Sequence, residues 1–486
     1  MHLTYTYNAA GNTTQQVQES ATKNLTTDYA YDPLGRLTAS TRTDGAKAAY
    51  SYDANGNQTN GTDTDRLTGQ LVKFSATFNP ANQQTNRVTD PGAGLTLDGP
   101  AKTIVTNTFD HAGNLTVQKT ESTRQVNGNS GHTETTSITA KNTFDYTNRL
   151  LTQARDDGQN TAYTYDGLGR TATQTLPTGL DQSKKNKGNG NGAGPHNTGC
   201  GIGGTTPGCP GVGDLTMFGG KTARVFHEGL TPIAWATSDL STNLVYGPQG
   251  PDHQVTTTGA GATSSWLYLD RQGTVRATAG ADGVTTSASA YTDFGVLEPA
   301  AGTLYAGAGT EAAPGQEDKL SAVHLPVATT RTPVGYTAEQ ANPVAGLQHY
   351  YARDYQPGMA NWIQADKWTG LQALPATLNK YIYVLDNPTT EVDLLGACIW
   401  DLCIGEGAAL AWVIGFAVVG IAGIWSWWMS EKRPIFNSTP AWPESQAVPT
   451  PQAGPAPVDP NDDGGNQEDP SQSNKRYDDS EGGQDL

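Results

Sequence analysis

Polar and apolar positions alternate over short stretches through most of the first 396 residues, and turn-forming residues separate the stretches. An alternation with a period of two is typical of a strand that buries one face. Each stretch is long enough for one short strand only. Gly, Asn and Asp gather between the stretches, as they do in tight turns. The pattern therefore predicts a mainly β chain made of successive hairpins.

A six-residue pattern recurs in these stretches: an aromatic residue, Asp or Asn, two variable residues, Gly or Asn, and finally Asn or Arg. We expect the aromatic residue to end a strand with its ring buried. The Asp side chain then accepts backbone N–H groups in the turn, and Gly supplies the positive φ that closes it. The clearest copies contribute Tyr31, Asp32, Gly35 and Arg36; Tyr52, Asp53, Gly56 and Asn57; Phe109, Asp110, Gly113 and Asn114; and Tyr165, Asp166, Gly169 and Arg170.

Each copy of the pattern predicts one β-hairpin. A single hairpin is marginally stable in water, whereas stacked hairpins bury their apolar rows against one another. Changes in composition divide the whole chain into six parts. These are a hairpin array at 1–182, a Gly-rich disordered insertion at 183–213, further strands at 214–345, a core segment at 346–396, a variable region at 397–430 and a disordered Pro-rich acidic tail at 431–486.

One apolar run, 407–429, has 23 residues and no charge. A helix of that length crosses a bilayer core of about 30 Å. Trp425, Trp427 and Trp428 gather at one end, as the aromatic residues at a membrane interface do. The run therefore predicts a transmembrane helix with lipid as its partner. A buried apolar helix of a toxin domain is the alternative.

Charge and composition exclude several functions. A net charge of −17 argues against a nucleic-acid partner, because phosphate binding needs patches of Lys and Arg. The N-terminal segment has neither the basic nor the apolar region of a signal peptide. His196, Cys200 and Cys209 do not have zinc-ligand spacing, so we predict no metal and no cofactor. A membrane-associated, cell-surface or secreted location is expected.

The six-residue pattern resembles the YD repeats of the Rhs family, which also occur in teneurins, in the C component of insecticidal Tc toxins and in wall-associated bacterial proteins. GLQHYYARDYQPGMANWIQADKW at 346–368 and NKYIYVLDNPTTEVDLLG at 379–396 are similar to the Rhs-associated core. The resemblance implies a β-spiral that forms a partial shell, with the core segment as its plug. It also implies a variable effector after the core, and an immunity protein or a secretion apparatus as a partner.

In relatives that process themselves, the core is an intramolecular aspartyl protease. The resemblance places its two carboxylates on Asp366 and Asp393 and its arginine on Arg353, with cleavage near Gly396 and Ala397. Two carboxylates held close together cannot both ionise, so one serves as a base and the other as an acid. The family's proline after each Asp is missing here. The alternative is that both side chains only cap turns in the plug.

Three functions stay open at this point. The first is an Rhs-type scaffold that packages or presents a membrane-active C-terminal segment in toxin delivery or interbacterial competition. The second is a membrane-anchored surface scaffold for adhesion or carbohydrate binding, without enzymatic activity. The third is a self-cleaving aspartyl protease that releases the residues after about 396.

Overall fold

The computed structural model describes most of the first 397 residues, namely 2–19, 24–65, 69–92, 95, 100–125, 132–177, 218, 220–248, 250–298, 332–342, 345–370, 372 and 375–397. The chain divides into two units, Met1–Val418 and Val419–Leu486, and every described residue belongs to the first. The predicted insertion at 183–213, helix at 407–429 and tail at 431–486 lie outside the described residues. Among the helices that are described, none has the length and apolar character needed to cross a membrane.

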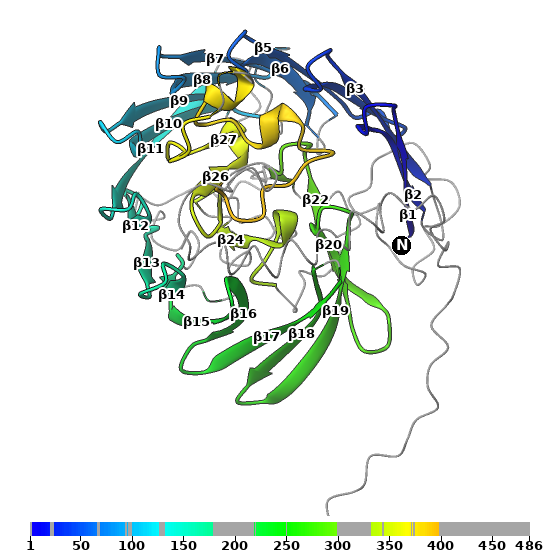
Figure 1. The fold of residues 1–486 in the computed structure, drawn as a ribbon, viewed down its shortest axis with the longest axis vertical. Coiled ribbons are helices and arrows are strands. Elements are labelled where there is room, and N and C mark those ends of the chain that lie inside the picture. Colours follow the sequence, from blue (N-terminus) through cyan, green and yellow to red (C-terminus); the bar gives the residue numbers. More distant parts are fainter. Residues whose placement is uncertain are drawn as a thin grey trace, which may run out of the picture. The chain divides into compact units, whose positions relative to one another are not determined.

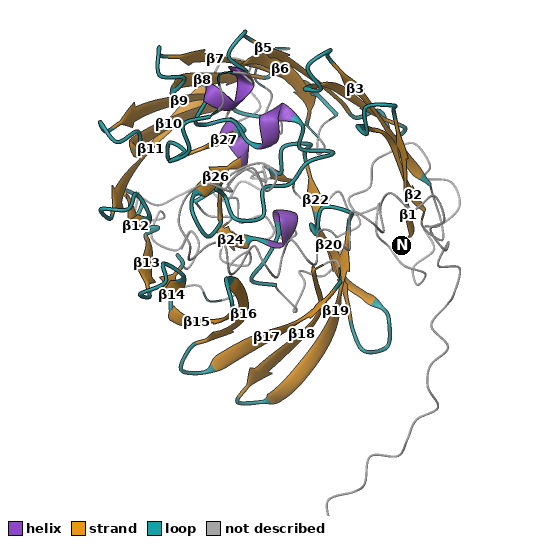
Figure 2. Ribbon diagram, viewed as in Figure 1, coloured by secondary structure: helices purple, strands orange, loops and turns teal. Residues whose placement is uncertain are grey.

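Twenty-one strands form one antiparallel sheet, which confirms the mainly β prediction (Figures 1 and 2). The strands are β1 (His2–Tyr7), β2 (Thr13–Glu19), β3 (Leu25–Tyr31), β4 (Leu37–Arg42), β5 (Lys47–Tyr52), β6 (Gln58–Thr64), β7 (Leu71–Phe78), β8 (Gln84–Asp90), β9 (Lys102–Phe109), β10 (Leu115–Gln125), β11 (Thr133–Phe144), β12 (Leu150–Arg155), β13 (Thr161–Tyr165), β14 (Thr171–Thr175), β15 (Thr222–Glu228), β16 (Thr231–Ala236), β17 (Leu240–Gly247), β18 (Gly250–Thr258), β19 (Gly261–Leu269), β20 (Val275–Ala279) and β21 (Thr285–Ala288).

Each strand of this sheet pairs with the next one along the chain. The pairing of β14 with β15 joins the strands before and after the Gly-rich insertion, so the two predicted repeat regions form a single sheet. Among the described strands, β1 pairs only with β2 and β21 only with β20, and the sheet is therefore open.

Smaller elements follow the long sheet and include the core segment. Strands β22 and β23 form a two-stranded sheet, and β24 to β27 form a four-stranded one. Four short 3-10 helices lie among and after them in the described chain. The bounds are β22 (Ala290–Tyr291), β23 (Leu297–Glu298), η3 (Tyr336–Ala338), β24 (Gln340–Asn342), β25 (Leu347–His349), β26 (Asp354–Gln356), η4 (Pro357–Met359), β27 (Asn361–Trp362), η5 (Pro375–Leu378) and η6 (Val384–Asp386).

The repeat turns close with the same hydrogen bonds each time. Between β3 and β4, Asp32 Oδ1 accepts the N–H groups of Leu34 at 2.9 Å and of Arg36 at 3.0 Å. Gly35 has a φ of +83°, a value that L side chains rarely adopt. Asp53, Asp110 and Asp166 accept the N–H of the residue four positions on, which is Asn57, Asn114 and Arg170 respectively.

The aromatic residue of the repeat is half-buried, whereas the sequence pattern led us to expect a buried ring. Tyr31, Tyr52, Phe109 and Tyr165 all keep an intermediate exposure. The fully buried position comes after the turn, at Leu37, Leu115 and Leu150, whose exposed fractions are 0%, 1% and 0%. The tyrosine hydroxyls reach the preceding hairpin, where that of Tyr52 donates to the Leu37 carbonyl at 2.6 Å and that of Tyr165 to the Leu150 carbonyl at 2.7 Å.

The core segment binds the row of repeat turns. Asn387 Nδ2 donates to Asn12 Oδ1 at 3.0 Å, and Asn379 Nδ2 donates to Asn57 Oδ1 at 2.8 Å. The Tyr381 hydroxyl donates to the Gly113 carbonyl at 2.9 Å, and the Tyr351 hydroxyl to the Leu168 carbonyl at 2.7 Å. These bonds join turns spread over the first half of the chain to one short segment, and they fix where the candidate site lies.

Candidate functional site

The three residues predicted to form a protease site meet at one guanidinium group. Arg353 Nη1 lies 2.9 Å from Asp366 Oδ2, and its Nη2 lies 3.3 Å from Asp393 Oδ2. The guanidinium also stacks over the Trp362 ring, 4.2 Å from its centroid. Residues that are up to 40 positions apart in the chain are therefore brought together by charge-assisted hydrogen bonds, which are the stronger class in proteins.

The two carboxylates differ in their surroundings. The Asp393 side chain is 1% exposed and that of Asp366 is 15% exposed. The pKa of Asp393 is raised to about 6, because burial and, to a smaller extent, the nearby charge of Asp366 outweigh the lowering effects of Arg353 and two backbone N–H groups. Asp393 therefore holds a proton below about pH 6, next to a second carboxylate that is more open to water.

Each carboxylate also closes its own turn, although no proline follows it. Asp366 Oδ1 accepts the Trp368 N–H at 2.8 Å. Asp393 Oδ1 accepts the N–H groups of Leu395 and Ala397, both at 3.2 Å. Side-chain bonds of this kind hold the backbone in a turn without the fixed φ of proline. Both predicted roles, turn cap and member of a carboxylate pair, are thus compatible with the geometry.

The peptide bond between Gly396 and Ala397 lies within this cluster. Arg353 Nε donates to the Gly396 carbonyl at 2.5 Å, while Asp393 Oδ1 contacts the Ala397 nitrogen. The backbone of Gly396 has a φ of +66°. A side chain there would lie 2.8 Å from Cβ of Tyr350, which is closer than such atoms approach. Glycine is therefore required before this bond.

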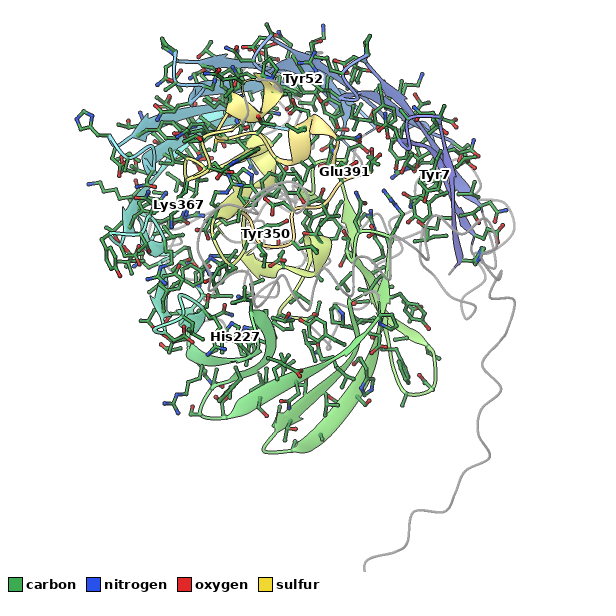
Figure 3. The ribbon with its side chains drawn as sticks, viewed as in Figure 1. Tyr7, Tyr52, His227, Tyr350, Lys367 and Glu391 are labelled. Atoms are coloured by element: carbon green, nitrogen blue, oxygen red, sulfur yellow. The ribbon has the colours of Figure 1, made fainter. Side chains whose placement is uncertain are left out.

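A group of buried aromatic side chains meets the cluster through Trp362, which lies under Arg353, and Tyr350, which lies beside Gly396. Tyr350, Tyr355, Trp362 and Tyr383 are each at most 1% exposed and pack against one another. Tyr350 lies within the core segment in Figure 3, apart from Tyr52 and His227 on the strands of the long sheet. These aromatic side chains limit the access of water and lower the local dielectric constant, which strengthens the interactions of the Arg353 charge.

Sequence reasoning missed a second buried polar group beside this site. His349 Nδ1 lies 2.7 Å from Asp354 Oδ1, and His349 Nε2 lies 2.8 Å from Thr171 Oγ1. Gln364 Nε2 donates to Asp354 Oδ2 at 2.7 Å. A His and an Asp five positions apart match no known sequence motif. The group can be recognised only in the folded chain, where Thr171 of β14 lies beside His349.

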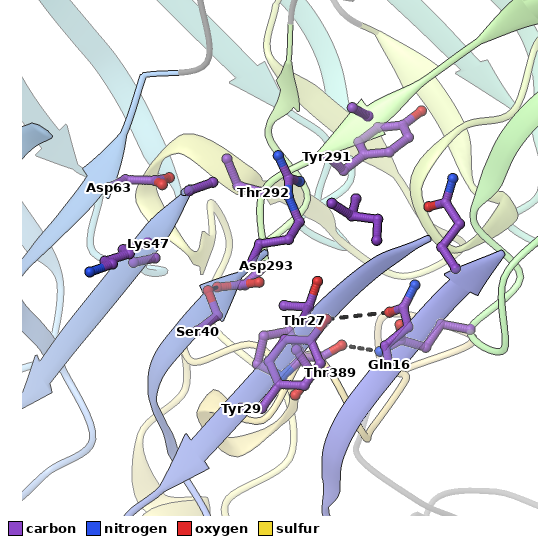
Figure 4. A pocket seen from close by; sticks show the side chains of 18 of the residues that line it. Gln16, Thr27, Tyr29, Ser40, Lys47, Asp63, Tyr291, Thr292, Asp293 and Thr389 are labelled. Atoms are coloured by element: carbon purple, nitrogen blue, oxygen red, sulfur yellow. Dashed lines mark hydrogen bonds between the residues drawn. The ribbon is translucent and has the colours of Figure 1, made fainter. Parts of the chain in front are cut away.

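A polar cavity lies between strands β2 to β5 and the end of the long sheet (Figure 4). Asp293 in its wall accepts the hydroxyls of Ser40 at 2.6 Å and of Tyr50 at 3.0 Å. Burial raises the pKa of Asp293, and those two hydrogen bonds oppose the shift. Arg276, also in the wall, donates to Asp270 at 2.8 Å. Because these groups bond within the protein, we assign the cavity no ligand.

Metal binding has no support among the described residues. No group of three or more His, Cys, Asp or Glu side chains in that part of the chain is placed to hold an ion. His196, Cys200 and Cys209 lie outside it.

The sequence model of the RHS repeat matches residues 7–47 and 31–68, which cover the turns at Asp32 and Asp53. Residues 7–68 of the chain therefore carry RHS repeats. No curated protein matches its sequence.

Solved structures similar to this RHS-repeat chain include Tc toxin complexes. A crystal structure of TcdB2-TccC3-Cdc42 is 16% identical with a TM-score of 0.36, and covers 81% of this chain and 19% of that one. The Tc holotoxin pore of Photorhabdus luminescens is 12% identical with a TM-score of 0.23, and covers 81% of this chain and 23% of that one. The chain thus spans about a fifth of the length of the toxin chains it matches.

A third structure, a porin-like protein from Bacteroides uniformis, is 15% identical with a TM-score of 0.22. It covers 35% of this chain and 80% of that one. These similarities assign no activity to this chain.

Proposed function

We propose that the chain is an Rhs-type scaffold that presents the segment after residue 396. The observation that carries the proposal is the core segment itself: it binds the row of repeat turns through Asn379, Tyr381 and Asn387, and its last residue, Gly396, is buried against Arg353. Because the core segment is held in this way, the chain that follows it begins at a fixed position on the scaffold.

The cargo in this proposal is the apolar run 407–429 and the residues around it. Its length and lack of charge suit a membrane-active segment, with a lipid bilayer as the partner. Toxin delivery or interbacterial competition is the setting that the repeats favour, with an immunity protein or a secretion apparatus as further partners. Such a segment needs a carrier, because its apolar surface is insoluble alone.

Expression of residues 397–486 in the bacterial envelope tests this role. We expect growth arrest and recovery of the segment in the membrane fraction. The matched variant Ile421→Arg, which places a charge in the middle of the apolar run, should lose both effects. An anchored adhesion scaffold would be supported instead by two results together. The segment alone would not affect growth, and the full-length chain would stay uncut and still partition with membranes.

A second function is favoured by the geometry at Gly396: intramolecular cleavage of the bond to Ala397. In this mechanism Asp366 takes a proton from a water molecule as the water attacks the Gly396 carbonyl carbon. Arg353 Nε–H, already on that carbonyl oxygen at 2.5 Å, stabilises the negative charge that develops. As the C–N bond breaks, Asp393 gives its proton to the Ala397 nitrogen. The products are the Gly396 carboxylate and a new amino terminus.

Cleavage should depend on pH in a defined direction. The active pair holds one proton, on Asp393, and the pKa of Asp393 is raised to about 6. Above that pH both carboxylates are ionised and no acid remains for the leaving nitrogen. We therefore expect the rate of self-cleavage, followed by intact mass after cell-free synthesis, to fall as the pH rises from 5.5 to 8. A rate that increases over this range would contradict the assignment of Asp393 as the acid.

A further inference from the structure

The buried group around His349 shares a short stretch of backbone with the candidate protease site. Asp354 follows Arg353 directly, and its side chain faces His349 across the β25–β26 pair. The side chains of His349 and Asp354 are 3% and 1% exposed. Neither contacts Gly396 or Ala397 in any described hydrogen bond, so neither is placed to act on the peptide bond itself.

Asp354 is tied to the chain that leads into Asp366. Its backbone N–H donates to Gln364 Oε1 at 2.8 Å, and its Oδ2 accepts Gln364 Nε2 at 2.7 Å. Its carbonyl accepts the Ile363 N–H at 3.0 Å. Three hydrogen bonds therefore tie Asp354, which follows Arg353, to residues two and three positions before Asp366.

His349 anchors this cross-link to the repeat array. Its ring stacks on Tyr163 of β13, with centroids 4.3 Å apart and planes 12° apart. A carboxylate only accepts, so His349 Nδ1 carries the proton toward Asp354, and Nε2 faces the Thr171 hydroxyl at 2.8 Å. A second anchor is the Leu115 N–H, which donates to the Ile363 carbonyl at 2.8 Å.

We propose that His349 and Asp354 are positioning residues that hold Arg353 and Asp366 at the Gly396–Ala397 bond. The inference rests on the proposed self-cleavage and names the residues that set its geometry. Rigid support is required because a displacement of about 1 Å in a catalytic group costs on the order of 100-fold in rate. The fold provides that support in two ways. The His349 imidazole contacts Tyr163 of β13 and Thr171 of β14, and the Asp354 carboxylate is held by His349 and Gln364.

The test compares cleavage rates of full-length variants made by cell-free synthesis, with the melting temperature of each measured on an uncut Asp393→Asn background. His349→Asn keeps a donor for Asp354 but loses the stacking on Tyr163. His349→Phe keeps the stacking and loses the donor. We expect His349→Asn to cleave within about threefold of the wild-type rate and His349→Phe to be slower by about 10- to 100-fold.

A double variant separates positioning from stability. His349→Phe with Asp354→Leu replaces both polar partners by apolar groups, a change that is often nearly neutral for folding. We expect a melting temperature within a few degrees of the parent but cleavage slowed by about 10- to 100-fold. Wild-type cleavage by the double variant, or rates that follow only the melting temperatures, would overturn the positioning role.

The outcome also separates this inference from the function on which it rests. A wild-type chain that stays uncut refutes self-cleavage and the positioning role with it. A wild-type chain that is cut, with both Phe variants cut at the same rate, refutes the positioning role alone. If the double variant does not fold, Asp354→Asn decides: it cannot accept from both His349 and Gln364, so a wild-type rate contradicts the proposal.

Discussion

One buried carboxyl group, that of Asp386, lies where the core segment meets the repeat turns. Asp386 is 2% exposed, and its Oδ2 has no hydrogen-bond partner. Burial raises the pKa of Asp386 well above its usual range; Arg36 opposes the shift, and Asp32 and Asp53 add to it. Burial beside two repeat turns therefore favours the neutral form of this side chain in the folded protein.

Removing that acid should change how stability depends on pH. A folded pKa above the unfolded value of about 3.9 contributes stability that is present below the unfolded pKa and lost as the pH rises through the folded pKa. Asp386→Asn, which mimics the neutral acid, should therefore stabilise the chain by a few degrees at pH 8 and change little at pH 4. Thermal melts at both pH values check this. An equal shift at both would rule out titration of Asp386.

Residue-level predictions succeeded where the chemistry is local. The role of Asp32 and Gly35 follows from hydrogen bonds within five positions, and the sequence contains all of them. The orphan acid at Asp386 and the pairing of His349 with Thr171 could not be foreseen, because each depends on which hairpin meets the core. Arg353, Asp366 and Asp393 were named from a resemblance alone, and the fold supplies the geometry that brings them together.

At the scale of elements, neighbouring hairpins are joined by hydrogen bonds and cation–π contacts that the repeat pattern in the sequence does not reveal. The Tyr52 hydroxyl donates to the Leu37 carbonyl of the hairpin before it, and the Arg36 guanidinium lies over the Tyr52 ring at 4.8 Å from the centroid. Tyr165 repeats both contacts with Leu150 and Arg149. Leucine after the turn, rather than the aromatic residue before it, fills the interior.

The leucine position should dominate the stability of a hairpin. Leu37 is fully buried, so Leu37→Ala should lower the free energy of unfolding by about 2–5 kcal/mol. Leu34, three positions earlier in the same turn, is 72% exposed, and Leu34→Ala should change it by about 0.5 kcal/mol or less. Urea unfolding of both variants measures the difference. Similar losses in the two would contradict the assignment of the core.

The tyrosine hydroxyl of the repeat should contribute less to the free energy of unfolding than the buried leucine does. Tyr52→Phe removes the hydroxyl that donates to the Leu37 carbonyl and should cost about 1 kcal/mol. Tyr146, which is 95% exposed, provides the matched control, since Tyr146→Phe removes a hydroxyl that faces water. An unfolding free energy that is unchanged in both variants would show that the link between hairpins does not contribute to stability.

At the scale of the whole molecule, the first half of the described chain is tied to its last fifty residues. The Tyr31 hydroxyl lies 2.8 Å from the Thr389 hydroxyl, 358 positions away, and Thr171 meets His349 across 178 positions. The sequence predicts an array and a plug separately. That the repeat turns are the surface on which the core segment binds follows only from the fold, because long-range contacts of this kind leave no local pattern.

The most direct measurement is the intact mass of the purified full-length chain after incubation at pH 5.5, beside Asp366→Asn, Asp393→Asn and the surface control Asp282→Asn. The account predicts a wild-type product that ends at Gly396 and a second one that begins at Ala397. The control should be cut equally, and both site variants should stay at the full mass of 51.2 kDa. An uncut wild-type chain, or cleavage that persists in both site variants, would contradict the proposed chemistry at Arg353, Asp366 and Asp393.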